Sequence, residues 1–448
     1  MENQKNDNLN MLEAIVQNTE MGKNTLDQLV PMAEDEQFKA ELLRQRNIYR
    51  QLNQEAHAAI DACGGGDAVY IPAGIYLTGA LRLHSNMELY LDEGAILQGT
   101  AEIVDYQPRI PSRFEGTEMR CYSSLLNAGD MNHKTGPNCR NIIIRGRGTI
   151  CGGGQELARK IIEDERARIK SFLDDNRELV ESCENSDTIP GRVRPRLINL
   201  SNCENVWISG ITLKNGPSWN VHMIYCDDIQ TDHCTFVSEG VWNGDGWDPD
   251  SSTNCTLFAS EFSTGDDAVA IKSGKNPEGN EINRPCAHIR VFDCRSDCGH
   301  GICIGSEMSG GVEDVQIWDC DLANSLSGIE IKATPKRGGY VRGVTVRDCI
   351  TPRVMLHSVP YNDDGVPAGA PPKLEHCFFE RLTLTAEVLD HDRSRHDAAP
   401  IEIAGFDTPG YEVEDIVFKD ITITKPSVAL PLGLCKGVTL SNLACVKE

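Results

Sequence analysis

Five carboxylates gather in one region of the chain. The stretch WNGDGWDPDSS (residues 242–252) and the segment after it contain Asp245, Asp248, Asp250, Asp266 and Asp267. Carboxylates held close together repel, so we expect at least one to have a raised pKa and hold a proton near neutral pH while others stay ionised. A protonated carboxyl beside ionised carboxylates is what glycoside hydrolysis requires.

Three simpler roles stay open for residues in this region. Asp248 and Asp250 are expected to be turn residues that bond their own backbone. The acids could instead hold Ca²⁺, which prefers oxygen ligands. His300, in CGHGICIG, could be an interior histidine with satisfied hydrogen bonds, although its flanking glycines allow the backbone to approach a ligand closely.

These residues lie within a repeating pattern that covers most of the chain. NCENVWISGITLKN, YCDDIQTDHCTFVS, CAHIRVFDCRSD and GVEDVQIWDCDLAN each read as a short alternating strand, a polar break and a second short strand. Units of about 20 to 30 residues rich in Val, Ile, Thr and Phe indicate a solenoid whose strands stack into parallel sheets. The sequence predicts an all-β fold, a parallel β-helix. An antiparallel sandwich would need frequent Asn-Gly or Asp-Gly turns, which are scarce.

Such a coil brings distant residues together. Residues one coil apart stack about 5 Å from each other. Asp245 lies 21 residues before Asp266, His300 lies 33 after Asp267, and Lys332 lies 32 after His300. Taking each interval as one coil, we predict that these side chains line a single groove.

Two segments depart from the strand pattern. Residues 8 to about 62 have apolar residues at three-to-four spacing, so residues 1–57 are predicted as a helical N-terminal segment whose role the sequence does not indicate. Residues 58–448 then form the β-helix domain. Within it, residues 155 to about 184 are helical by period and heavily charged, and are expected to be a surface insertion on one face of the solenoid.

Composition excludes several classes of partner. The net charge of −24 and pI near 4.9 argue against nucleic acid and against an acidic membrane surface. No apolar run is long enough to span a bilayer, and MENQKNDNLN lacks the features of a secretion signal, so we expect a cytoplasmic protein. The 18 cysteines form no CxxC pairs and are expected to be free, buried thiols of a reducing compartment. Oligomeric state is not indicated.

Four segments, in order, carry a family resemblance. NGDGWDPDSS, STGDDAVAIKSG, CGHGICIGSEMSGGV and GIEIKATPKRGGYV resemble the signature segments of the polygalacturonases, glycoside hydrolase family 28. The likeness runs from about Ala58 to the C-terminus. It implies a right-handed parallel β-helix, hydrolysis of α-linked galacturonic acid in pectin with inversion at the anomeric carbon, and no metal or organic cofactor. The GICIGSEMSGGV segment is similar to that of bacterial exo-acting members, so cleavage from chain ends is expected.

The resemblance also implies roles for the catalytic residues. Asp266 resembles the general acid that protonates the leaving oxygen, and Asp245 and Asp267 resemble the pair that activates water. His300 resembles the residue that supports protonation of the acid. Lys332 resembles a ligand of a substrate carboxylate, and Tyr361, in HSVPYNDDG, could match an active-site tyrosine of the family. Asn243 and Glu330 are further candidate substrate contacts.

One of these positions departs from the family pattern. Where the family usually has Arg-Ile-Lys, this chain has Glu330, Ile331 and Lys332, so the guanidinium that would grip a uronate carboxylate is missing. A glutamate next to a uronate would repel it. Either the adjacent sugar is neutral, as in branched pectin such as rhamnogalacturonan, or Lys336 or Arg337 pairs with the glutamate.

Three functions are therefore compared. The first is a hydrolase of pectic oligosaccharides. The second is a pectate lyase or uronate epimerase on the same scaffold, which would need a base beside the carboxylate, commonly with Ca²⁺, and no acid for the leaving oxygen. The third is a non-catalytic sugar-binding β-helix, for which three acids and a histidine in one groove would be unnecessary.

Overall fold

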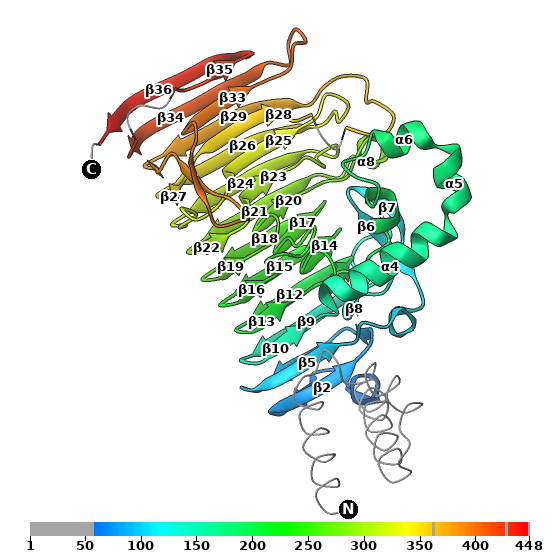
Figure 1. Cartoon of the computed structure of the whole chain (residues 1–448). Coiled ribbons are helices and arrows are strands. Elements are labelled where there is room, and N and C mark those ends of the chain that lie inside the picture. Colours follow the sequence, from blue (N-terminus) through cyan, green and yellow to red (C-terminus); the bar gives the residue numbers. More distant parts are fainter. Residues whose placement is uncertain (1–57, 361–362, 426–428, 447–448) are drawn as a thin grey trace, which may run out of the picture.

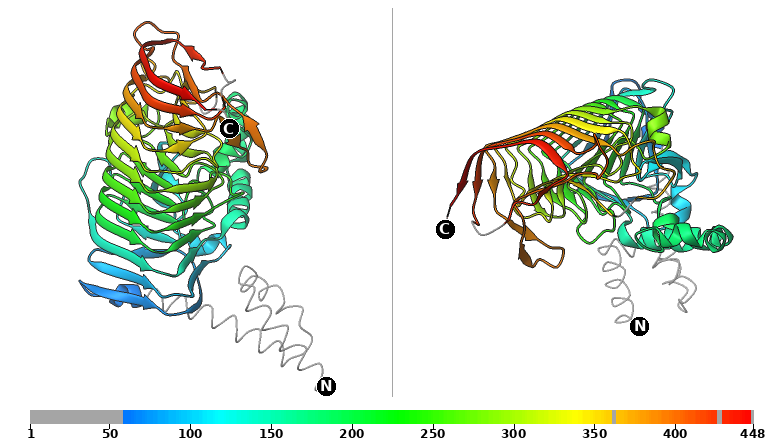
Figure 2. Two further views of the ribbon diagram at one scale, coloured as in Figure 1. Left: turned by 90° about the vertical axis from the view of Figure 1, so that its left-hand side faces the viewer. Right: turned by 90° about the horizontal axis from the view of Figure 1, so that it is seen from above.

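The computed structural model describes residues 58–360, 363–425 and 429–446. Their strands wind into a long stack of coils (Figure 1), and the side view in Figure 2 shows the coils lying one above another. The predicted helical segment, residues 1–57, lies outside the described residues.

Three sheets of parallel strands run along the stack. Sheet I has 14 strands: β1 (Asp67–Ile71), β4 (Met87–Leu91), β9 (Cys139–Gly146), β12 (Cys203–Ser209), β15 (Asp227–Asp232), β18 (Thr253–Phe258), β21 (Cys286–Phe292), β24 (Val312–Trp318), β26 (Tyr340–Arg347), β27 (Ile350–Thr351), β29 (Lys373–Glu380), β30 (Thr383–Leu384), β34 (Val413–Ile423) and β36 (Cys435–Cys445). Sheet II has seven: β2 (Gly74–Thr78), β5 (Ala95–Gly99), β10 (Thr149–Cys151), β13 (Thr212–Lys214), β16 (Thr235–Val237), β19 (Glu261–Ser263) and β22 (Arg295–Cys298).

Sheet III carries the predicted site. Its 11 strands are β3 (Leu81–Leu83), β8 (Leu126–Ala128), β11 (Ile198–Ser201), β14 (Val221–Ile224), β17 (Trp247–Asp250), β20 (Val269–Ile271), β23 (Gly301–Ile304), β25 (Gly328–Ala333), β28 (Val354–Ser358), β33 (Ile401–Ala404) and β35 (Leu432–Gly433). These strands pair in parallel with in-register partners, for example Val221 with Trp247 and Ile302 with Ile329. The predicted fold class, a right-handed parallel β-helix, is confirmed.

The core runs along the inside of the coil. Alternate residues of each strand, such as Val269, Ile271, Ile302 and Ile304, are buried in it, because successive side chains of a strand point to opposite faces. All 18 cysteines are free thiols. Fourteen of them are buried, and many belong to this core.

Sharp corners join the strands of each coil. Asparagines occupy several corners in the left-handed region, for example Asn141 and Asn205 with φ of 58° and 54°. Asparagine tolerates this conformation better than most residues. The Asn205 amide donates to Asn141 Oδ1 at 2.8 Å, so the stacked corners also bond to each other.

Two hairpins and a group of helices lie outside the coil. The antiparallel hairpins are β6 (Ile110–Phe114) with β7 (Thr117–Cys121), and β31 (Glu387–Leu389) with β32 (Arg395–Asp397). The helices are the 3-10 helix η2 (Ile103–Tyr106), α4 (Gly154–Arg168), α5 (Lys170–Asp175), α6 (Arg177–Glu181), α7 (Thr188–Gly191) and α8 (Glu278–Ile282). None of the described helices is long and apolar enough to cross a membrane.

The helices α4 to α6 occupy the region predicted as a helical insertion, α7 follows it, and all four lie on one side of the stack (Figure 1). Helix α4 is not wholly solvated. Its Leu157 and Ile161 are completely buried against Tyr106 and Tyr122, next to hairpin β6–β7.

Candidate active site

Four of the predicted residues meet at the edge of sheet III where its strands begin. Asp245 precedes β17, Asp266 and Asp267 precede β20, and His300 precedes β23. Parallel pairing of these strands brings their starting ends together. Lys332, within β25, extends its ammonium group to the same place.

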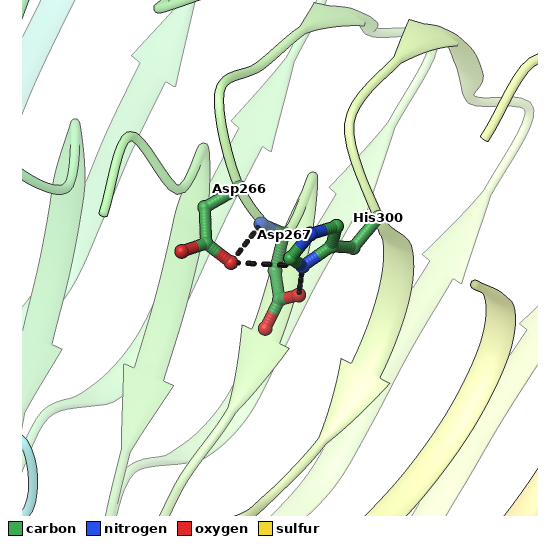
Figure 3. A group of neighbouring side chains, drawn as sticks. All are labelled: Asp266, Asp267 and His300. Atoms are coloured by element: carbon green, nitrogen blue, oxygen red, sulfur yellow. Dashed lines mark hydrogen bonds and ion pairs between the residues drawn. The ribbon is translucent and has the colours of Figure 1, made fainter. Parts of the chain in front are cut away.

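His300 bridges two adjacent carboxylates. Its Nδ1 lies 3.0 Å from Asp266 Oδ1 and 3.1 Å from Asp267 Oδ1, and Figure 3 shows the three side chains pointing toward one another. Lys332 Nζ lies 3.3 and 3.1 Å from the two Asp267 oxygens. Asp267 is thus held firmly and is only 2% exposed, whereas 23% of the Asp266 side chain is accessible from outside.

The electrostatics of this cluster keep Asp267 ionised. Burial alone would raise the pKa of Asp267, but Lys332 and then His300 outweigh it and hold the pKa far below its usual value. Burial likewise lowers the pKa of His300, but Asp266 and Asp267 outweigh this effect and raise it well above its ordinary value. At neutral pH, His300 is therefore an imidazolium whose Nδ1–H donates a shared hydrogen bond to Asp266 Oδ1 and Asp267 Oδ1.

A second charged group lies beside the first. Lys272 Nζ lies 3.6 Å from Asp245 Oδ2 and 3.3 Å from Glu307 Oε2, and all three side chains are buried. Burial, followed by the charge of Asp248, raises the pKa of Asp245 well above its usual range. The pKa is raised for Asp245 and lowered for Asp267, which agrees with the expectation that crowded carboxylates differ in their hold on a proton. Asp245, a member of the pair that the resemblance assigns to water activation, shares this raised pKa with its neighbour Asp248.

The expectation that Asp248 and Asp250 are turn residues is wrong. Both lie in β17 and are completely buried. Asp250 accepts from Arg113 Nη1 at 2.6 Å and contacts His222 Nε2 at 3.2 Å. Neither carboxylate oxygen of Asp248 has a hydrogen-bond partner among the described residues, and burial raises the pKa of this group well above its ordinary value.

The coil spacing behind the predicted groove is partly wrong. Trp247 pairs with Val269, so a coil here has 22 residues and places Asp245 level with Asp267 rather than Asp266. The next coil agrees with the assumption, because Val269 pairs with Ile302 and Asp267 is therefore level with His300. The coil after it differs, because the backbone N–H of Ser327 donates to the carbonyl of His300. Ser327, and not Lys332, is therefore one coil after His300. Lys332 contacts the site because its side chain is long enough to reach Asp267.

The remaining predicted contacts have other surroundings. Asn243 Oδ1 accepts from Arg194 Nη2 at 2.6 Å, so part of its amide is engaged by the protein. Tyr361 lies outside the described residues.

One alternative expected Lys336 or Arg337 to pair with Glu330. Glu330 pairs with neither of them. It is 4% exposed and bonds His357 Nε2 at 2.7 Å. Burial would raise the pKa of Glu330, but Lys332 and then His357 outweigh it and bring it to about 2. Lys336 instead bonds the Asp363 backbone carbonyl, and Arg337 bonds Asn276. The glutamate is an ionised internal acid with a histidine partner that sequence reasoning missed.

Asp266, Asp267 and His300 also have a spacing that a metal ion could use, since their ligand atoms lie within 4.8 Å of one another. The donor chemistry does not fit. An imidazolium has no free lone pair for a metal, and Lys332 already neutralises Asp267. The cluster is arranged for proton chemistry.

Turnover should therefore be unchanged in excess chelator. The measurement is the initial rate of product formation after dialysis against EDTA, with and without added Ca²⁺. Loss of activity on chelation and its return with Ca²⁺ would contradict this expectation and identify the acids as metal ligands.

Several residues of the site were not predicted. Lys272 was visible in STGDDAVAIKSG, where its alternation with the inward Ile271 places it on the outer face of sheet III. No local signal indicates Arg113, which arrives from hairpin β6–β7, or His391, which arrives from hairpin β31–β32 and lies 3.3 Å from His300.

Comparisons with known proteins agree with this geometry. Residues 113–359 match Glycosyl hydrolases family 28. The chain is 34% identical over 291 residues to a probable polygalacturonase of Vitis vinifera, covering 63% of this chain and 53% of that protein. It is 25% identical over 410 residues to an exo-poly-alpha-D-galacturonosidase of Dickeya chrysanthemi, covering 86% of this chain and 67% of the relative. The chain thus spans about half the length of the grapevine relative.

Solved structures share the fold. A hyperthermoactive exopolygalacturonase from Thermotoga maritima superposes with a TM-score of 0.69 at 24% identity, covering 88% of this chain and 86% of the other. A family 28 exopolygalacturonase of Yersinia enterocolitica gives 0.71 at 22% identity, covering 88% and 75%. The match over residues 113–359 includes all four signature segments and the strands that position the carboxylates. The chain belongs to family 28 of the glycosyl hydrolases.

Proposed function

We propose that the protein hydrolyses α-linked galacturonic acid in pectic oligosaccharides, with inversion at the anomeric carbon. The observation that carries the proposal is the cluster in which protonated His300 bonds both Asp266 and Asp267, with Asp245 in the preceding coil. The relatives named polygalacturonase and exo-poly-alpha-D-galacturonosidase support the substrate class.

In the proposed mechanism, the imidazolium of His300 passes its Nδ1 proton to Asp266, 3.0 Å away, and Asp266, the carboxyl accessible from outside, delivers that proton to the leaving oxygen. Asp267, kept ionised by Lys332 and His300, accepts a proton from the attacking water together with Asp245. Asp245 and Asp248 titrate as interacting groups, so a proton held on Asp248 leaves Asp245 free to act as a base beside Lys272.

The structure removes the main reason to favour a neutral sugar. That alternative assumed an unpaired Glu330 facing the substrate, but this carboxylate is buried and bonded to His357. We therefore favour plain oligogalacturonate over branched pectin. Binding of the substrate carboxylate by Lys332 stays a prediction from the family resemblance.

Hairpin β6–β7 supports cleavage from chain ends. Ser112 bonds Asn199 of β11 at 2.9 Å, and Phe114 stacks on Trp219 with ring centroids 4.9 Å apart. Trp219 in turn packs on His222 of β14. These contacts cover part of the outer face of sheet III in the coils before Asp245. We infer that they block a sugar chain from extending in that direction.

The test of the reaction is incubation with homogalacturonan oligosaccharides and branched pectic fragments, followed by chromatography of the products and assignment of the new anomer by NMR. We expect saturated products whose new reducing end has the β configuration. Unsaturated products that absorb in the ultraviolet and disappear on chelation would establish a lyase instead.

Exo action has its own measurement. During early digestion of long homogalacturonan, reducing ends should accumulate while viscosity falls little, because each cut removes only a terminal unit. A steep drop in viscosity before reducing ends accumulate would show internal cleavage. It would contradict the inference that hairpin β6–β7 blocks the sugar chain on one side.

We also propose that the protein acts in the cytoplasm on imported oligosaccharides, which the 18 free thiols support because disulfides are rare there. Fractionation of cells that express the protein, followed by immunodetection, checks this location.

A further inference from the structure

Hairpin β31–β32 carries a residue to the catalytic cluster from outside the region that matches the family. The match ends at residue 359, and the hairpin spans residues 387–397. In Figure 1 it is the orange segment that runs downward across the strands of earlier coils. The hairpin therefore lies against coils that come well before it in the sequence.

Polar anchors hold the hairpin in this position. Arg393 donates to Glu239 Oε1 at 2.9 and 2.6 Å and to the carbonyl of Asp297 at 3.0 Å. Arg395 donates to Asn324 Oδ1 at 2.6 Å. Glu239 lies just before the loop that leads to Asp245, so the tip of the hairpin is fixed against the wall of the site.

The tip places His391 against the catalytic histidine. Nε2 of His391 lies 3.3 Å from Nε2 of His300, with the rings edge to face and their centroids 5.3 Å apart. Nδ1 of His300 already bonds Asp266 and Asp267. Each polar atom of the His300 ring therefore has a partner, and only His391 engages the Nε2 side among the described residues.

The protons in this contact can be assigned. His300 donates from Nδ1 to the two carboxylates, and as an imidazolium it also carries a proton on Nε2. A contact between two Nε2 atoms needs one donor and one acceptor, so with His300 as the donor His391 accepts at Nε2. An acceptor at Nε2 stabilises the charged form of His300.

We propose that His391 is a positioning residue, which accepts a hydrogen bond from His300 and so holds the ring in the orientation that serves both Asp266 and Asp267. The inference rests on the proposed function. It adds to that function a contribution from a segment beyond the family region. His391 acts on the reaction only through His300.

The first test does not depend on turnover. The imidazole pKa of His300 is measured by NMR in the free protein, with the signal assigned by its absence in His300→Gln. The charged and titratable groups around His300 are Asp266, Asp267, Glu184, Lys332 (through Asp267) and His391. In His391→Ala the carboxylates and Lys332 are unchanged, so we expect the pKa of His300 to fall because the acceptor for the imidazolium is lost. An unchanged pKa overturns the proposal, whatever the substrate proves to be.

The second test is kinetic and uses oligogalacturonate. In His391→Ala we expect kcat to fall about tenfold, the effect of losing one orienting hydrogen bond, with little change in KM. The alkaline limb of the pH profile should move to lower pH, since His300 loses its proton earlier. His391→Gln, whose amide oxygen can also accept, should recover most of the rate.

His396→Gln is the matched control. His396 lies in the same hairpin and bonds Ser394, away from His300. This variant should behave as the wild type in rate, pH profile and thermal midpoint. A loss of activity in His391→Ala through KM alone, or equal losses in His391→Ala and His391→Gln at an unchanged thermal midpoint, would overturn the positioning role. If the wild type hydrolyses no pectic substrate, the proposed function fails while the NMR result still decides the inference.

Discussion

Replacing Asp266 with asparagine is expected to abolish turnover with almost no change in thermal midpoint. The amide keeps the shape of the carboxyl and its contact with the N–H of Asp267, but it cannot deliver a proton to the leaving oxygen. General acid catalysis contributes about 10² to 10⁴ in rate, so kcat should fall by that factor. The measurement is kcat on oligogalacturonate together with a melting curve of each protein.

Two comparisons make this result specific. Asp293→Asn is the control, since Asp293 is an exposed corner residue with φ of 51°, a conformation that asparagine tolerates. It should retain the wild-type rate. If Asp266→Asn kept more than half of that rate on a substrate with a poor leaving group, another residue would have to be the acid.

The largest effect on stability is expected for Arg113→Met. Arg113 and Asp250 are both completely buried and lie 2.6 Å apart. Methionine would leave the Asp250 carboxylate beside only His222, whose pKa is lowered to about 4 first of all by burial, so that it is neutral at pH 7. Removing one partner of a buried ion pair costs about 3–5 kcal/mol of folding free energy. The measurement is the midpoint of thermal and denaturant unfolding.

The stability that the Arg113–Asp250 pair contributes should depend on pH. Burial would raise the pKa of Asp250, but Arg113 and then His222 outweigh it and bring it to about 2. The stability from the pair is therefore present above pH 3.8, the ordinary pKa, and is lost as pH falls toward 2. The difference between Arg113→Met and wild type should shrink over that range. Adding Asp250→Asn to Arg113→Met should restore much of the lost stability at pH 7. If it does not, the stability is lost through poorer packing and not through the unpaired charge of Asp250.

Much of the fold could be predicted because each coil repeats the same local chemistry. Alternating residues such as Val269 and Ile271 indicate strands, and asparagine corners such as Asn141 and Asn205 indicate where they end. The exact number of residues in each coil could not be predicted, because the loops between strands vary in length. The interval from Val221 to its partner Trp247 differs from that between Trp247 and Val269.

The catalytic cluster was predictable for a related reason. Asp245, Asp267 and His300 precede strands that pair directly, so the repeat itself brings them together. Glu330 shows the limit of this reasoning. Its partner His357 lies in the next strand of sheet III, two positions beyond the residue that pairs with it. Which charges meet across the outer face depends on side-chain reach, and strand patterns do not contain that information.

The anchored hairpin also restricts how this solenoid can change in evolution. Repeat proteins commonly gain or lose whole units, because each unit contacts only its neighbours. Here Arg393 bonds Glu239 across several coils. Duplicating or deleting one coil between them would shift the hairpin along the axis by about 4.8 Å, more than a hydrogen bond tolerates. His391 would then leave His300, so changes in coil number should be confined to the parts of the chain before Glu239 or after the hairpin.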